Sequence, residues 1–441
     1  MPLLKNALRW TAMAAAMVLA GGLALATGLL WYLHPQPGDW QLRLPLLRLA
    51  DQRFDAPVSI AAAVRLLSQP GVGRLLDGST WQTPAGLLHI RWDAAQQAQQ
   101  LRCAPCRLLL PALGSAPLEL PELEVSLHGQ TQGQGHDAVE QLRGQWRANG
   151  IHGQWQGTLD AHAIEVELHL QDQPLQEAFA LFGGAIPELA HAHIEGSITL
   201  NAQARWPAGA FSVDPALSGF AVSGLDTRRL LQAPHRCQTD GAPPIATDGL
   251  LARAVIAAED QRFFEHPGYD LIEWQHSLRQ NQQARADGRP SRLRGASTLT
   301  QQLAKLAFTG DDRTALRKIR ELLYAVEMEQ SLGKARILQQ YLQRVPWGEG
   351  QCGGQAAAQH YFGVDAADLN PAQAAWLAAM LHRPDYHARQ WRGTGQIDLT
   401  RARWVLDQLR ARPRDLTPRQ RAQWQGRLEQ LGRPRPQGKA G

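Results

Sequence analysis

Residues 254–268 read AVIAAEDQRFFEHPG and place two adjacent carboxylates, Glu259 and Asp260, inside an otherwise apolar helical pattern. Leu251, Val255 and Glu259 follow one another at intervals of four residues, so they share one face of the predicted helix. A carboxylate on the same stripe as leucine and valine points toward packing or a cleft rather than toward open water. Taken alone, the pattern favours an ordinary helix whose polar edge begins at Glu259.

The composition is that of a folded protein with more than one domain. The chain has 441 residues, of which 44% are hydrophobic and 19% charged, and this length allows two or three cores. The net charge of +5 gives no reason to expect a nucleic-acid partner. Residues 411–441 form a basic C-terminal tail, which is either solvated or in contact with anionic lipid headgroups.

The N-terminus predicts a membrane anchor. After Lys5 and Arg9 no Asp, Glu, Lys or Arg appears until Asp39. Residues 11–33 are therefore long enough to span a bilayer as one helix, which needs about 20 apolar residues. The positive flank places residues 1–10 in the cytoplasm and the rest of the chain on the periplasmic side of the inner membrane. A cleaved signal peptide is the alternative, but the apolar run is long for one, and we favour an uncleaved single-pass anchor.

The cysteines predict disulfides rather than a metal site. The chain has four cysteines, Cys103, Cys106, Cys237 and Cys352, in an expected compartment that permits disulfides. Cys103 and Cys106 form a CxxC motif, but no second CxxC exists to complete a zinc site. The first two are interpreted as a local disulfide or as two buried thiols. The other two are candidates for a long-range pair, which sequence alone does not establish.

Residues 38–232 alternate between apolar and polar positions over several runs, which is typical of strands with one buried face. One run holds Leu88, Ile90 and Trp92, and similar runs lie near residues 123–127, 164–170 and 198–206. Asn149-Gly150 stands between two runs and predicts a tight hairpin turn. We expect an antiparallel β-rich domain, whose role as a spacer, a partner-binding module or a lipid-contacting surface stays open.

The pattern changes at residues 233–246, where prolines and a glycine indicate a linker. Beyond it, residues 247–410 show helical periodicity. Asp248 is the expected N-cap of the helix that carries Glu259, and this helix is expected to end near Gly268, where a Pro-Gly pair stops it. Asn370-Pro371 has the residue types of an N-cap and a first helical position, so it predicts the start of the last core helix.

Two further segments of the helical region carry candidate chemistry. Residues 294–305 read RGASTLTQQLAK, in which Thr298 and Gln301 have the spacing of a capping box and predict a helix start. Hydroxyls at a helix N-terminus followed by a lysine suit phosphate binding. On the next predicted helix, Arg317 and Glu321 form either an ordinary surface ion pair or part of a basic cluster around a second buried carboxylate.

Together these segments resemble the five motifs of the family-51 glycosyltransferases, the peptidoglycan transglycosylases. The matching stretches are AEDQRFFEHPGYD, RGASTLTQQLAK, RKIRE, KARILQQYL with GQAAAQHYFG, and the helix at 370–384, in that order. The resemblance covers roughly residues 245–386 and is to the monofunctional type, here with an extra N-terminal β-rich domain. It implies a mainly α, lysozyme-like fold for this region. It also implies polymerisation of lipid II into glycan strands for peptidoglycan biosynthesis, cell wall biogenesis and cell shape.

The resemblance also implies roles for single residues. Glu259 matches the general base that deprotonates the acceptor sugar hydroxyl, and Glu321 matches the second essential glutamate. A bound Mg²⁺ or Mn²⁺ is compatible with the family, and cell-wall synthesis proteins are conceivable partners of the β-rich domain. The positions that match the diphosphate-binding cations are Lys305, Arg313, Arg317 and Lys318, those of the substrate-binding second motif are Ser297, Thr298 and Gln302, and those of supporting residues are Asp260, Phe263, His266, Gly268 and Asp270.

The chemistry of such a reaction fits these residue types. The leaving group would be undecaprenyl diphosphate, so negative charge grows on phosphate oxygens in the transition state. Converging cations stabilise that charge better than neutral donors do. The acceptor hydroxyl needs a base, which a glutamate facing a cleft can supply. A displacement with inversion needs no covalent intermediate, so the lack of an evident nucleophile is no obstacle.

Four positions depart from the family pattern, namely Leu306, Gln339, Gln343 and Gln373. They bear on packing and substrate contacts, and neither catalytic glutamate is among them. Two other functions are therefore kept as alternatives to transglycosylation. One is a non-catalytic scaffold that binds lipid II or partners of cell-wall synthesis, and the other is a lytic, lysozyme-like enzyme. The cation cluster argues against the lytic reading, because cleavage of a glycan strand releases no diphosphate.

Overall fold

The computed structural model describes residues 27–28, 31–37, 39–49, 52–83, 85–108, 118–133, 138–207, 210–232, 237, 244–289, 295–310, 314–409 and 416–431. Most of the anchor expected at 11–33, most of the linker at 233–246, and Arg313 lie outside these ranges. Within them, no helix combines the length and the apolar character needed to cross a membrane. The chain divides into two compact units, one made of residues 1–108, 118–173 and 198–216, the other of residues 109–117, 174–197 and 217–441.

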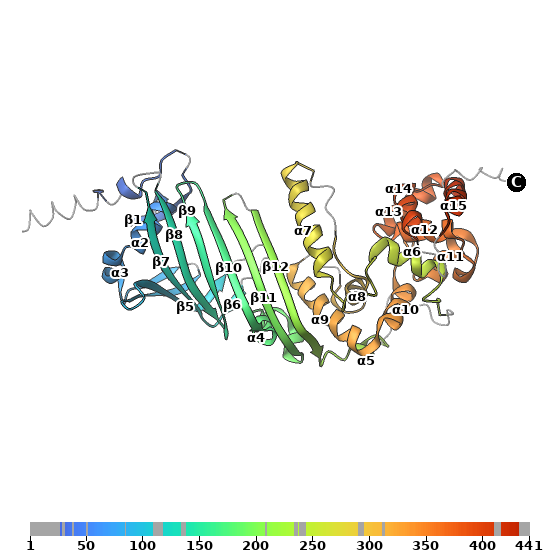
Figure 1. Ribbon diagram of the computed structural model, residues 1–441, viewed down its shortest axis with the longest axis horizontal. Coiled ribbons are helices and arrows are strands. Elements are labelled where there is room, and N and C mark those ends of the chain that lie inside the picture. Colours follow the sequence, from blue (N-terminus) through green and yellow to red (C-terminus); the bar gives the residue numbers. More distant parts are fainter. Residues whose placement is uncertain are drawn as a thin grey trace, which may run out of the picture. The chain divides into compact units, whose positions relative to one another are not determined.

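Ten strands of the described chain form one sheet (Figure 1). Its order is β12-β11-β10-β9-β8-β7-β5-β4-β3, with β6 paired to β5, and the pairs from β3 to β10 are antiparallel, as predicted. A separate antiparallel pair consists of β1 (Gln41–Leu49) and β2 (Gln52–Ser59). The strands of the large sheet are β3 (Thr80–Thr83), β4 (Gly86–Asp93), β5 (Ala98–Leu108), β6 (Leu118–Leu120), β7 (Leu123–Gln132), β8 (Val139–Ala148), β9 (Ile151–Leu159), β10 (Ile164–Pro174), β11 (His193–Trp206) and β12 (Ala210–Ser223).

The alternation expected from the sequence gives this sheet one buried face in the first unit. Helix α2 (Ile60–Ser68) packs against β7, and α3 (Pro70–Leu76) packs against β4. Ala61 of α2 shares a core with Leu142 and Leu159 of the sheet. The predicted Asn149-Gly150 turn joins β8 to β9 with φ angles of 43° and 87°, the left-handed region that asparagine and glycine tolerate.

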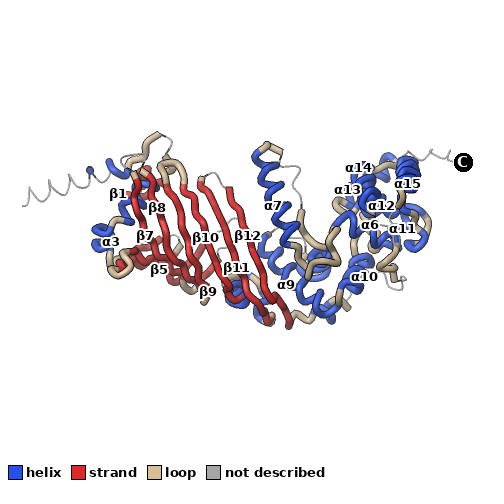
Figure 2. The backbone as a smooth tube through the Cα atoms, in the orientation of Figure 1, coloured by secondary structure: helices blue, strands red, loops and turns tan. Residues whose placement is uncertain are grey.

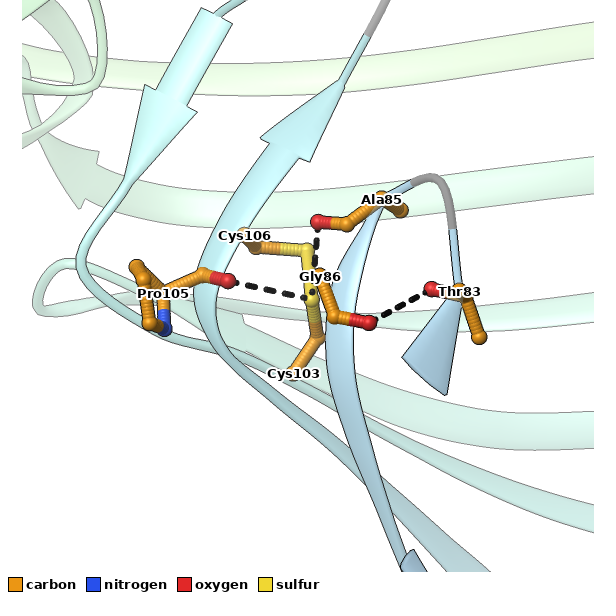
Figure 3. The surroundings of a disulfide bond; sticks show 6 residues. All are labelled: Thr83, Ala85, Gly86, Cys103, Pro105 and Cys106. Carbon is orange, nitrogen blue, oxygen red and sulfur yellow. Dashed lines mark hydrogen bonds between the residues drawn. A yellow bond between two sulfur atoms is a disulfide. The ribbon is translucent and has the colours of Figure 1, made fainter. Parts of the chain in front are cut away.

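The CxxC motif forms a disulfide between Cys103 and Cys106 on β5 (Figure 3). The bond lies beside Gly86, whose carbonyl accepts a hydrogen bond from the Thr83 hydroxyl at 2.8 Å. A Cβ at Gly86 would lie only 2.3 Å from the carbonyl oxygen of Pro105, and the φ angle there is +128°. Only glycine therefore lets β4 approach the disulfide turn so closely. The second expected pair, Cys237 with Cys352, is also bonded and lies within the second unit.

The second unit is mainly helical, as Figure 2 shows. Helix α12 is its centre, since Ala374, Trp376 and Leu377 are at most 1% exposed and α6, α14 and α15 all pack on it. The helices are α4 (Leu175–Ala180), α5 (Thr227–Leu230), α6 (Leu250–Glu259), α7 (Leu271–Ala286), α8 (Leu299–Ala304), α9 (Ala315–Leu332), α10 (Lys334–Arg344), α11 (Gly354–Phe362), α12 (Pro371–Met380), α13 (Pro384–Thr394), α14 (Leu399–Gln408) and α15 (Pro418–Leu431), with a π-helical turn η5 (Lys305–Thr309) after α8.

Two predicted helix starts are confirmed. Thr298 caps α8, where its hydroxyl accepts from the Gln301 amide at 3.1 Å and the Gln301 side chain accepts from the Thr298 amide. Asn370 caps α12 in the same way, with Gln373 as its capping-box partner. Glutamine serves the capping box as well as glutamate does, so the departure at Gln373 leaves this helix start intact.

The predicted limits of α6 are wrong at both ends. Its N-cap is Gly249 rather than Asp248, and the helix ends at Glu259 instead of continuing to residue 268. Asp260 leaves the helix with φ −162° because its carboxylate accepts hydrogen bonds from other parts of the chain. The early end makes Glu259 the last helical residue.

The segment expected as a basic tail, residues 411–441, contains a packed helix. Helix α15 contacts both α12 and α14. Leu428 is fully buried in that contact, whereas the neighbouring Arg427 lies over the ring of Trp424 at 4.7 Å. The part of this segment that the structure describes is therefore joined to the helical core.

Helix α9 is hydrogen-bonded to other segments of the second unit. The buried Glu327 accepts hydrogen bonds from the backbone amides of Leu225 at 2.8 Å and Thr227 at 3.0 Å. Two turns earlier, Arg320 binds both oxygens of the buried Glu188 at 2.8 and 2.9 Å. All of these residues belong to the second unit. Residues 174–197 and 217–231 therefore form part of the support of α9.

Glu327→Ala is expected to loosen this attachment locally. The substitution leaves the amides of Leu225 and Thr227 buried without an acceptor, and each unmade hydrogen bond of this kind costs about 1–3 kcal/mol. Hydrogen exchange followed by mass spectrometry should show faster exchange in peptides that cover residues 222–231. Glu195→Ala, at an exposed glutamate of the same unit, is the matched control and should leave those peptides unchanged. Equal exchange in both variants would contradict a supporting role for Glu327.

Candidate active site

Glu259 ends α6 with a side chain that is 11% exposed and held by two donors. Its Oε1 accepts a hydrogen bond from Arg401 Nη2 at 2.8 Å, and its Oε2 accepts one from Gln302 Nε2 at 3.2 Å. The hydroxyl of the fully buried Tyr341 donates to Gln302 Oε1 at 2.9 Å, which orients the amide so that its NH₂ group faces the carboxylate. Glu259 is therefore fixed in direction but still reachable from solvent.

Asp260, by contrast, is engaged entirely within the protein. Its Oδ2 accepts from the backbone amide of Leu299 at 2.8 Å, and His266 Nε2 lies 3.0 Å from both carboxylate oxygens. Thr298 donates its hydroxyl to the carbonyl of Gly268 at 2.7 Å and is only 3% exposed. These contacts tie the end of α6 to the start of α8, so Asp260 and Thr298 act within the protein as supports of Glu259 and Gln302.

The remaining supporting residues of the first motif are also packed inside. Gly268 has a φ angle of +97°, and a Cβ there would lie 2.9 Å from the carbonyl of Ala325. Phe263 is fully buried beneath the ammonium group of Lys334, 4.5 Å from the ring centre. Asp270 is 8% exposed and accepts from the amide of Glu273 at 3.0 Å, which stabilises the first turn of α7.

Glu321 on α9 has no exposed side-chain surface and is paired with two cations. Arg317, one turn earlier, binds its Oε1, and Lys318 Nζ donates to its Oε2 at 2.6 Å. The same Lys318 ammonium donates to the hydroxyl of Ser297 at 2.6 Å. Of the two interpretations left open by the sequence, the basic cluster around a buried carboxylate is therefore confirmed.

The cations of this cluster influence one another. Burial, the charge of Arg317 and the charge of Lys305 lower the pKa of Lys318 to about 8, although the Glu321 carboxylate beside it acts in the opposite direction. Lys305 lies on η5, directly after α8, and is partly buried. A bound polyanion would stabilise the cluster, because it would offset the repulsion among these cations.

Helix α8 and its flanks connect the two carboxylates. Ser297, just before the helix, contacts the cluster of Lys318 and Glu321, whereas Gln302, on the helix, contacts Glu259. Of the predicted site residues that the structure describes, Lys305, Arg317 and Lys318 lie around the same part of α8 and α9. The arrangement joins a reachable carboxylate with a group of cations suited to an anion such as a diphosphate.

Two contributors to this site were missed in the sequence. Arg401 lies on α14, beyond the five motifs, and a single arginine in an amphipathic helix carries no local signal. Tyr341 lies in the fourth motif and is fully buried. Its hydroxyl contact with Gln302 depends on how α10 packs on α8, which the periodicity does not specify.

The residues do not form a ready site for the Mg²⁺ or Mn²⁺ with which the resemblance is compatible. In the part of the chain that the structure describes, no three His, Cys, Asp or Glu side chains converge as metal ligands do. The carboxylates of Glu259, Asp260 and Glu321 are each bound by protein donors instead. The chemistry that can be assigned is therefore that of the side chains themselves.

Comparison with known proteins points to one family. A family model described as "Transglycosylase" matches residues 240–410. A protein from Nitrosomonas eutropha named "Biosynthetic peptidoglycan transglycosylase" is 37% identical over 177 residues, 39% of this chain and 69% of that protein. Proteins of the same name from Bordetella avium and Bordetella pertussis are 49% identical over 139 residues and 44% identical over 189 residues. These two matches cover 31% and 42% of this chain and 57% and 76% of the relatives.

Proposed function

The chain belongs to the peptidoglycan transglycosylase family, and we propose that it is a membrane-anchored glycosyltransferase that polymerises lipid II into glycan strands. The observation that carries the proposal is the pairing of a reachable, fixed carboxylate at Glu259 with the cations Lys305, Arg317 and Lys318. A glycosyl transfer from a lipid diphosphate needs both a base and a receptor for the leaving phosphates.

In the proposed reaction, Glu259 accepts the proton of the acceptor sugar hydroxyl as that oxygen attacks the anomeric carbon of the donor. A new carbon–oxygen bond forms while the bond from the anomeric carbon to the diphosphate oxygen breaks. The leaving undecaprenyl diphosphate takes the bonding electrons, and Lys305, Arg317 and Lys318 stabilise its charge, joined by Arg313 from outside the described residues. Glu321 keeps two of these cations in place at 0% exposure.

The proposal includes a location. A helix at residues 11–33 would anchor the enzyme in the inner membrane with its catalytic unit in the periplasm, where a lipid-linked substrate is within reach. The growing glycan strand and cell-wall synthesis proteins would be its partners, the latter through the β-rich unit. The disulfides Cys103–Cys106 and Cys237–Cys352 suit an oxidising compartment.

The decisive experiment incubates the full chain, purified in detergent, with lipid II and follows polymer by gel electrophoresis. Polymeric glycan is the expected result. Binding of lipid II without polymer would favour a non-catalytic scaffold instead. Shortening of preformed glycan strands would favour a lytic enzyme.

Lys318 should give substrate binding a characteristic dependence on pH. Its ammonium form is complete below pH 7 and is lost as pH rises through about 8, so affinity for a short-chain prenyl diphosphate should fall between pH 7.5 and 9.5. For one linked proton the limiting slope is about tenfold per pH unit. Lys318→Arg keeps its charge and should flatten this slope in titration calorimetry. An equally steep loss of affinity in that variant would exclude Lys318 as the titrating group.

A further inference from the structure

Arg401 reaches the catalytic carboxylate from a helix that lies outside the recognised motifs. Its Nη2 donates to Glu259 Oε1 at 2.8 Å and to the backbone carbonyl of Ala258 at 2.7 Å. Both acceptors belong to the last turn of α6. The carbonyls of a final helical turn have no intrahelical donor and carry partial negative charge. Arg401 therefore binds the end of the helix and the carboxylate at once.

The position of Arg401 is set by rigid surroundings. Helix α14 starts at an N-cap, Asp398, whose side chain accepts from the amide of Thr400 at 2.9 Å. On either side of the arginine, Leu399 and Ala402 are 9% and 0% exposed, because α14 packs on α12 and α6. The Arg401 side chain itself is 33% exposed, so it lies at the border between core and solvent.

The two oxygens of Glu259 have different partners. Oε1 is bound by a cation at 2.8 Å, whereas Oε2 is bound by the neutral amide of Gln302 at the longer distance of 3.2 Å. A charge-assisted hydrogen bond is about twice as strong as a neutral one. The hydrogen bond from Gln302 is therefore the one more easily replaced by an incoming hydroxyl. Its replacement leaves Oε1 bound to Arg401.

Resting on the function proposed above, we infer that Arg401 is a positioning residue for the general base. It holds Oε1 of Glu259, so that Oε2 is turned to receive the proton of the acceptor hydroxyl. A misplacement of a catalytic group by about 1 Å can cost about a hundredfold in rate, so this contact keeps the base where it can act. The guanidinium contacts the base rather than the substrate.

Other groups near Glu259 do not supply a comparable charge-assisted contact. Burial, with the negative charges of Glu259 and Asp260, raises the pKa of Tyr341 well above its usual value, so its hydroxyl stays neutral in the working range. Burial lowers the pKa of His382, which interacts with both Glu259 and Arg401, so it is neutral at pH 7. Asp260 is bound by His266 and by the amide of Leu299. Arg401 is the neighbour in hydrogen-bond contact that brings a positive charge.

The test measures kcat and KM for polymerisation of lipid II in Arg401→Met, Arg401→Lys and Arg403→Met. A misplaced base slows the chemical step rather than substrate binding, so the kcat of Arg401→Met should fall about tenfold or more while its KM stays within about twofold of wild type. Arg401→Lys should restore most of the loss. Arg403→Met is the matched control, since Arg403 lies on the same helix but pairs with the exposed Glu429.

A second readout does not depend on activity. Carbodiimide labels a carboxyl group faster when no protein donor holds it, so mass spectrometry of the peptide that contains Glu259, at one fixed pH, gives its rate of labelling. A labelling rate that rises in Arg401→Met but not in Arg403→Met supports the inference even if the wild type makes no polymer, a result that would overturn only the proposed function. An unchanged labelling rate, or a kcat of Arg401→Met within about twofold of wild type, would overturn the role of Arg401.

Discussion

Glu259→Gln is expected to reduce the rate of lipid II polymerisation by a factor of about 10²–10⁴, the usual contribution of a positioned general base. The amide has nearly the same shape as the carboxylate and can still accept from Arg401, but it cannot take a proton from the acceptor hydroxyl. Quantification of polymer from radiolabelled lipid II at saturating substrate would measure the loss.

Binding and folding controls separate this loss from damage to the protein. Glu259 is 11% exposed and lies at a helix end, so the amide should leave the melting temperature and the affinity for lipid II close to wild type. Asp260→Asn should behave differently. Asp260 accepts from Leu299 and contacts His266, so its variant should be less stable as well as less active. A Glu259→Gln enzyme that keeps more than a tenth of the wild-type rate would exclude Glu259 as the base.

The sequence predicted much of the fold because local rules and packing agree there. The hairpin at Asn149-Gly150 and the helix starts at Thr298 and Asn370 depend on backbone conformations and caps that neighbouring residues determine. The limits of α6 failed for the opposite reason. The helix ends at Glu259 because Asp260 accepts a hydrogen bond from the amide of Leu299, 39 residues further along the chain. The sequence around Asp260 does not indicate a partner at that distance.

The residues of the candidate site were likewise predicted only in part. Helical spacing placed Arg317 and Glu321 together, since both lie on one face of α9. Burial distinguished a basic cluster around a buried carboxylate from a surface ion pair, and burial is a property of packing between helices. The motifs could not reveal Arg401, because it contacts Glu259 from a helix 142 residues further along the chain. The supporting contact of Glu327 with Leu225 and Thr227 was equally invisible before the fold was known.

Glu321→Gln is expected to lower both stability and activity strongly. The carboxylate is fully buried, and its charge balances those of Arg317 and Lys318. Loss of one partner in a buried pair costs about 3–5 kcal/mol, because the charge of Arg317, whose side chain is 11% exposed, stays desolvated. Without the carboxylate the two cations repel each other and move, and a misplacement of about 1 Å can cost about a hundredfold in rate. Thermal unfolding and the polymerisation assay would record the two effects.

A variant of a second buried glutamate on α9 separates the effect on stability from the effect on activity. Glu327 is 7% exposed and is bound by two backbone amides instead of by the cation cluster. Glu327→Gln should therefore lower stability by about 1–3 kcal/mol while the polymerisation rate stays within about threefold of wild type. If Glu321→Gln lost rate only in proportion to stability, as Glu327→Gln would, then Glu321 would be a structural residue. A rate loss far beyond that proportion assigns Glu321 the task of holding Arg317 and Lys318 where the diphosphate leaves.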